Sequence, residues 1–226
     1  LLTLLMANHP QIGTIGELKA TSMGDIESYR CSCGNYIKSC EFWGTLTRSL
    51  QSEGSDLDLS DFNTHFSSSG WLRNKIMSAR VQGTFLELLR HLALNYIPPI
   101  RSEEKTLLDR NQLLMRHICR VQNSEVFLDG SKDSNRLLHF VRSNRWDIKV
   151  VNLVRDELGL LNSWMRRERR TMADAALRLI ETRREQKRVL ELVGEENVVH
   201  VDYNELCTNP LDELNRIYSR SGLQPV

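Results

Sequence analysis

The second half of the chain alternates between short apolar runs and longer segments in which apolar residues recur at helical spacing. Three runs are rich in β-branched residues and lie at 126–128, 149–154 and 198–201. Each is too short for a helix and predicts a strand buried on both faces of a parallel sheet. Segments with helical spacing separate and follow these runs, at 135–145, 158–192 and 211–219. This alternation predicts a doubly wound α/β domain, in which ligands bind beyond the carboxyl ends of the strands.

The first half of the chain has a different pattern. Leu1–Ala7 has the spacing of a helix end, and Pro10 stops it because proline disfavours helix in the residue before it. Ile12–Gly16 fits a short extended piece. Residues 41–124 contain no strand-like run, and helical spacing is clearest at 79–96 and 107–121. We therefore predict that 41–124 is a mostly helical insertion in the α/β domain.

Composition narrows the class of protein. The 226 residues are 40% hydrophobic and 26% charged, which excludes a disordered tail, a collagen-like fibre and a disulfide-rich miniprotein. Thirty basic side chains oppose 29 acidic ones, and a net charge of +1 does not indicate nucleic-acid or membrane-surface binding. No apolar run approaches the roughly 18 residues that span a bilayer. Five cysteines, an odd number, fit a reducing compartment, so we expect a cytoplasmic protein.

Charged residues follow each of the three predicted strands. The first strand is followed by Asp129–Ser134, which includes Lys132. The second is followed by Arg155 and Asp156, and the third by Asp202–Glu205. Because two of these strand ends carry a cation, the pattern favours an anionic ligand at the sheet edge. The alternative is that the lysine and the aspartate after it only cap the next helix.

The second strand end gives the most specific pattern. Ser163 and Arg167 are four residues apart on the predicted helix and share one of its faces. Arg155, which leaves the strand, can converge with them, and two arginine forks with one hydroxyl suit a phosphate monoester. The neighbouring arginines fit a solvated charged face instead, namely Arg166, Arg169 and Arg170.

These motifs resemble the sulfotransferases that use 3'-phosphoadenosine 5'-phosphosulfate. Val151–Asp156, with Ser163 eight residues after the arginine, is similar to the family's segment that binds the 3'-phosphate. In the tyrosylprotein branch a further arginine four residues past the serine contacts the nucleotide, and Arg167 matches it. Leu128–Asp133 resembles the strand-end segment whose lysine, here Lys132, stabilises the sulfuryl group in transit.

Further motifs of the same family lie in order along the chain. His9-Pro10 followed by Gly16-Glu17 resembles the family's His-Pro and Gly-Glu, which implies that Glu17 is the catalytic base. Val201–Leu206 is similar to the family's Tyr-Glu-x-Leu segment and adds Tyr203 to the nucleotide-binding set. The arrangement of Cys31, Cys33 and Cys40, followed by Phe42-Trp43, also looks like bacterial members.

The resemblance implies one P-loop NTPase-like three-layer domain over 1–226, with a central parallel sheet and the 41–124 insertion as the acceptor-site region. The implied reaction moves a sulfuryl group from the nucleotide donor to a hydroxyl or amine acceptor and requires no metal. The family's Gly/Ser/Thr-rich phosphate loop would precede Leu1, and its late basic loop would follow Val226. We therefore expect a fragment truncated at both ends that is inactive by itself.

Three alternatives stay open at this level. A P-loop kinase of related fold would need Gly-Lys-Ser/Thr in its phosphate loop. A non-catalytic nucleotide- or nucleic-acid-binding module would use the basic patch Arg166–Arg170, although sparse aromatic residues and a net charge near zero oppose it. A Ser-His-Asp site is open too, although no serine lies in a Gly-x-Ser-x-Gly elbow. The three cysteines lack the spacing and the nearby fourth ligand of a structural zinc site, so we interpret them as thiols in a turn.

Overall fold

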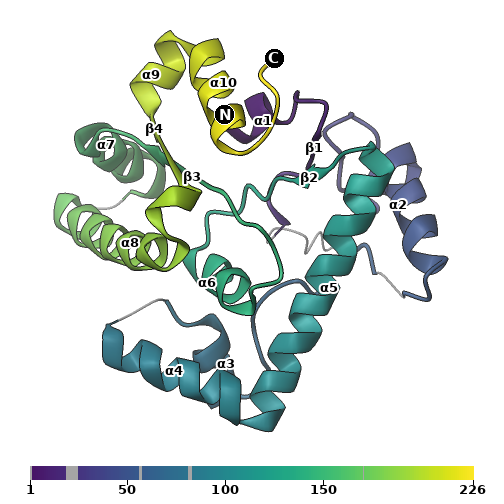
Figure 1. Ribbon diagram of the computed structural model, residues 1–226, viewed down its shortest axis with the longest axis horizontal. Helices are drawn as coiled ribbons and strands as arrows, with labels where there is room; N and C mark the ends of the chain where they lie inside the picture. Colours follow the sequence, from purple (N-terminus) through teal and green to yellow (C-terminus); the bar gives the residue numbers. More distant parts are fainter. Residues whose placement is uncertain (1, 19–24, 56–57, 81–82, 170) are drawn as a thin grey trace. The chain divides into compact units, whose positions relative to one another are not determined.

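Two pairs of parallel strands position the segments that carry the sequence motifs (Figure 1). Strand β1 (Ile12–Gly13) pairs with β2 (Val126–Phe127), and β3 (Val150–Val154) pairs with β4 (Val198–Asp202). The structure is a computed structural model that describes residues 2–18, 25–55, 58–80, 83–169 and 171–226.

The chain divides into two units, which are described separately. Unit 1 comprises Leu1–Ser78 and Arg90–Asp133, and unit 2 comprises Ala79–Leu89 and Ser134–Val226. The first pair of strands belongs to unit 1 and the second pair to unit 2.

Helices of unit 1 bury a large hydrophobic cluster. They are α1 (Leu2–Met6), the short 3-10 helix η2 (Ile37–Ser39), α2 (Glu41–Gln51), α3 (Trp71–Ser78) and α5 (Pro98–Gln122), while α4 (Thr84–Tyr96) contains residues of both units. α2 packs against α5 through Leu46, Leu50, Leu114 and Ile118, all of which are buried. Two prolines begin α5, where no backbone N–H is needed, and left-handed Asn123 ends it.

Unit 2 surrounds its strand pair with the remaining helices. They are α6 (Ser134–Ser143), α7 (Glu157–Glu168), α8 (Met172–Val193), the 3-10 helix η3 (Glu195–Asn197), α9 (Tyr203–Thr208) and α10 (Pro210–Arg220). α8 packs against both α6 and α7. Buried Val198, Val199 and Val201 place β4 in the core of this unit.

Most helices and strands agree with the prediction from the sequence, and two features of the structure correct that prediction. The three predicted strands and the helices predicted over 135–145 and 211–219 are confirmed. A single helix over 158–192 is wrong, because Arg169 adopts a left-handed conformation and Thr171 caps a new helix by accepting from Asp174 N–H. Burial of every strand on both faces is also wrong. His200 faces solvent on β4 and contacts the side chain of Asn152 on β3.

The structure agrees with the predicted helical insertion, whereas the predicted single sheet stays a prediction. In the described part of 41–124, the structure has α2 to α5 and no strand. The four strands form two separate sheets, so a single three-layer P-loop NTPase-like domain stays a prediction. None of the helices that the structure describes is long and apolar enough to cross a membrane.

Candidate functional site

Glu17 and Lys132, the two predicted catalytic residues, form an ion pair in unit 1. Glu17 follows β1 and Lys132 follows β2, so the parallel pairing brings the two strand ends to the same edge. The ammonium donates to Glu17 Oε1 at 2.5 Å, and 83% of the lysine side chain is accessible to solvent. The pair is therefore open to a substrate.

Backbone contacts hold the two loops that carry this pair. Asp129 Oδ1 accepts from the N–H of Leu18 at 3.2 Å and from that of Ser131 at 2.9 Å. The N–H of Gly130 donates to the carbonyl of Gly16 at 2.7 Å, and a Cβ at position 130 would lie 2.9 Å from that oxygen. Asp129 is a site residue whose role the sequence analysis missed, although an aspartate two residues before a serine is a known turn signal.

The pair has the chemistry of a proton acceptor beside a fixed positive charge. A carboxylate can take a proton from a hydroxyl, and an ammonium can stabilise negative charge that develops on a nearby oxygen. Since the two side chains contact each other, an entering substrate has to insert between them or share the lysine.

Arg155 lies at the carboxyl end of β3 in unit 2. Its guanidinium lies over the ring of Tyr203, the first residue of α9, 4.8 Å from the ring centroid. Such stacking fixes the orientation of the guanidinium plane. Arg183 on α8 donates to the backbone carbonyl of Arg155 at 3.4 Å, a further contact that spacing in the sequence did not reveal. The structure thus brings two predicted nucleotide-binding residues together.

Ser163 and Arg167 continue from Arg155 along one face of α7. A Cβ built on Gly159, in the first turn, would lie 3.4 Å from Arg155 Nε, so the arginine lies against this turn. Ser163 and Arg167 are four and eight residues further on, about 6 and 12 Å along the helix axis. A phosphate beside Arg155 can therefore reach the Ser163 hydroxyl, while exposed Arg167 must bend back toward the first turn.

The cap of α7 determines where this face begins. Asp156 Oδ1 accepts from the N–H of Gly159 at 2.8 Å and satisfies one free donor of the first turn. We expect Asp156→Ala to lower the free energy of unfolding by about 1 kcal/mol, measured by chemical denaturation. Asp156→Asn keeps the acceptor and is the control. Equal stability of the alanine variant and the wild type would contradict this role of the cap.

A hollow at the end of β3 and β4 does not suit an anion. Its lining includes Asp202, Glu205 and Glu213, with Arg216 as the cation. Arg216 is already bound, because it donates to Glu213 and to the carbonyl of His200 at 2.7 Å. The hydrogen bond with Glu213 raises the pKa of this guanidinium further. An anionic ligand therefore fits the side with Arg155 and Tyr203 better.

A serine, a histidine and a glutamate do meet in unit 1. Ser49 Oγ lies 2.7 Å from His117 Nδ1, and His117 Nε2 lies 3.3 Å from Glu53 Oε2. The histidine is fully buried between α2 and α5, and Arg116 and Arg120 both bind the glutamate. Since no substrate can reach the imidazole, we assign this network to the packing of α2 on α5.

Glu53 gives a pH dependence to that packing. The hydrogen bond from Arg120 lowers the pKa of the Glu53 carboxyl below its ordinary value of 4.5, and His117 and Arg116 add to this against partial desolvation. A carboxyl with a lowered pKa stabilises the fold above its unfolded-state pKa, and this contribution is lost as the pH falls through the folded-state pKa. We expect the stability difference between wild type and Glu53→Gln to be constant above about pH 5.5 and to shrink below about pH 4.5.

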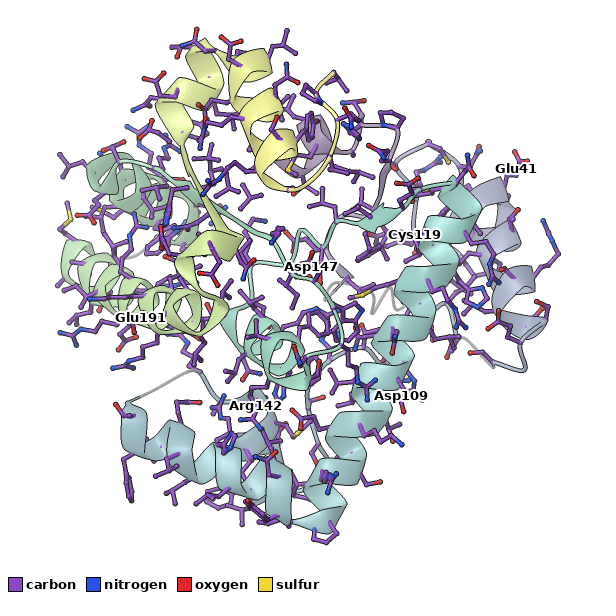
Figure 2. The ribbon with its side chains drawn as sticks, in the orientation of Figure 1. Glu41, Asp109, Cys119, Arg142, Asp147 and Glu191 are labelled. Carbon is purple, nitrogen blue, oxygen red and sulfur yellow. The ribbon has the colours of Figure 1, made fainter. Side chains whose placement is uncertain are left out.

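Denaturant titrations between pH 3 and pH 7 measure this difference. Glu191→Gln is the matched control, because exposed Glu191 on α8 (Figure 2) has an ion pair with Lys187 that is 4.0 Å long. A difference that stays constant down to pH 3 would exclude the role of Glu53.

The three N-terminal cysteines converge, which their spacing did not predict. The Sγ atoms of Cys31, Cys33 and Cys40 all lie within 4.8 Å of one another. Sequence spacing counts residues along the chain, whereas a turn and a helix start bring these thiols together in space.

Comparisons of the chain with protein-family models, with curated proteins and with solved structures find no match. Glu17 and Lys132 belong to unit 1, whereas the other four predicted site residues belong to unit 2. Those four are Arg155, Ser163, Arg167 and Tyr203. Each set has its own internal geometry, and a function has to be inferred from the chemistry of these residues.

Proposed function

We propose that this protein is a sulfotransferase that moves a sulfuryl group from 3'-phosphoadenosine 5'-phosphosulfate to a hydroxyl or amine acceptor. The observation that carries the proposal is the contact between Glu17 and Lys132, which are 115 residues apart in the sequence. The family resemblance implies that Glu17 is the base and Lys132 the electrostatic partner, and a contact between these side chains supports such a pairing of roles.

The proposed reaction needs a base, an in-line attack and stabilisation of the leaving oxygen. Glu17 takes the proton from the acceptor as its oxygen or nitrogen attacks sulfur. The bond between sulfur and the bridging oxygen breaks, and adenosine 3',5'-bisphosphate leaves. Lys132 neutralises the charge that develops on the bridging oxygen. Positioning and charge stabilisation supply most of the rate enhancement, as in phosphoryl transfer, and no metal takes part.

The residues of unit 2 are proposed to bind the donor. Arg155 and Ser163 hold the 3'-phosphate through charge-assisted and hydroxyl hydrogen bonds. Arg167 adds a second guanidinium, and Tyr203 keeps the plane of Arg155 fixed. The region 41–124 is proposed to form the acceptor pocket, and a cytoplasmic location stays a prediction from the cysteine content.

Nucleotide binding to the natural protein tests the proposal. Isothermal titration calorimetry compares adenosine 3',5'-bisphosphate with adenosine 5'-monophosphate, ADP and a single-stranded oligonucleotide. We expect the bisphosphate to bind at least about tenfold more tightly than the monophosphate, because only it offers the 3'-phosphate. Preference for ADP would support a kinase instead, and preference for the oligonucleotide would support a nucleic-acid-binding module.

Transfer of labelled sulfate from the donor to a panel of hydroxyl and amine acceptors then tests the reaction. Glu17→Gln keeps the shape of the side chain but cannot accept the proton, so we expect it to abolish transfer while the bisphosphate still binds. Transfer at the wild-type rate by this variant would exclude Glu17 as the base.

A further inference from the structure

A tight turn and the start of a helix bring three thiols together on unit 1. The turn is closed by hydrogen bonds from Cys31 N–H to the carbonyl of Asn35 and from Gly34 N–H to the carbonyl of Cys31. Gly34 has φ of 88°, a conformation that favours glycine. Cys40 directly precedes Glu41, the first residue of α2, which is labelled in Figure 2. Two of the three cysteines therefore lie on the turn and the third at the helix start.

A cation that binds thiolates displaces the protons of the thiols that ligate it.

We propose that Cys31, Cys33 and Cys40 bind one Zn²⁺ ion through three thiolates, with water as the fourth ligand. A tetrahedral zinc ion with Zn–S bonds of about 2.3 Å separates neighbouring sulfur atoms by about 3.8 Å. The Sγ atoms of Cys33 and Cys40 are 3.6 Å apart, and all three lie within 4.8 Å of one another. Small side-chain movements are therefore enough to close the site around the ion.

A disulfide explains the cluster less well. It would join two sulfur atoms about 2.05 Å apart and leave the third thiol unused. The zinc ion would link the 31–34 turn to α2 beside Trp43, which is buried in the core of unit 1. Zinc binding at this place is independent of the proposed sulfuryl transfer.

Zinc titration of the reduced, metal-free protein tests the site. A chromophoric chelator competes for Zn²⁺, and proton release is followed in weak buffer. We expect one zinc ion per chain, with protons released on binding. Cys33→Ser should weaken binding by more than the roughly 10- to 100-fold that follows loss of an outer-shell partner. Cys33 is exposed, so this variant keeps the packing of the turn.

Two other cysteines provide matched controls. Cys119→Ser removes a thiol from α5 (Figure 2), and Cys207→Ser removes an exposed thiol from α9. Neither variant should change zinc binding. Co²⁺ provides a second readout, because tetrahedral thiolate coordination gives intense sulfur-to-metal charge-transfer absorption, which Cys33→Ser should weaken.

Three results would overturn the proposal. The first is no zinc uptake by the reduced wild type. The second is uptake that is equally strong in Cys33→Ser and Cys31→Ser. The third is a Cys33–Cys40 disulfide in the isolated protein together with no zinc uptake after its reduction.

Discussion

Replacement of Lys132 by alanine in the natural protein should lower the turnover rate by about a hundredfold or more, the effect of one lost electrostatic donor. In the proposed reaction the ammonium meets negative charge that grows only as the bond between sulfur and the bridging oxygen breaks. The specificity constant should therefore fall together with the turnover rate, while donor binding stays largely unchanged. Steady-state kinetics with varied donor and calorimetry with adenosine 3',5'-bisphosphate measure these quantities.

The free energy of unfolding distinguishes a catalytic role of Lys132 from a structural one. The Lys132–Glu17 ion pair is exposed, so its loss should change the free energy of unfolding by about 0.5 kcal/mol or less. Lys38→Ala is the matched control, because Lys38 forms an exposed ion pair with Glu27 outside the proposed site. It should leave turnover unchanged. Near-normal turnover of Lys132→Ala would leave the reaction without its electrostatic partner and refute the assignment.

Replacement of Arg155 by alanine should weaken binding of adenosine 3',5'-bisphosphate by about 1.5–3 kcal/mol, the value of hydrogen bonds to a charged group. The loss should be much smaller for adenosine 5'-monophosphate, which has no 3'-phosphate to contact. Calorimetry with the two nucleotides gives the difference directly.

Two further variants sharpen this test. Arg155→Lys keeps the charge but loses the planar fork that lies over Tyr203, so we expect affinity between those of wild type and alanine variant. Arg166→Ala removes an exposed arginine from the same helix and should have little effect. Equal weakening of both nucleotides by Arg155→Ala would place the arginine away from the 3'-phosphate, and unchanged affinity would exclude it from the site.

The spacing of apolar residues predicted which helices and strands are present better than it predicted where they begin and end. The apolar run at 149–154 predicts β3 almost to the residue, because a β-branched run has few alternatives. The break between α7 and α8 was missed because arginine and glutamate continue a helical pattern through 165–170. Thr171 followed by Asp174 was the available signal, since the threonine caps the new helix.

Prediction of the candidate site from the sequence is limited by contacts between segments that lie far apart in the chain. The positions of Lys132 and Arg155, each just after the carboxyl end of a strand, could be predicted because an apolar run ends shortly before each of them. The hydrogen bond that Asp129 accepts from the N–H of Leu18 could not be predicted, since it depends on the position of a loop more than 100 residues earlier. The same holds for Cys40, whose distance from Cys31 in space depends on the turn and on the packing of α2.

The parallel pairing of β1 with β2 also has a consequence during synthesis on the ribosome. Ile12 pairs with Val126, so the first strand has no partner until more than 110 further residues have been added. At a translation rate of about 5–20 residues per second this takes roughly 6–23 seconds. Glu17 and Lys132 can therefore meet only after most of unit 1 has left the exit tunnel. Until then, the segment around Ile12 exposes an unpaired strand edge, the kind of surface that chaperones cover.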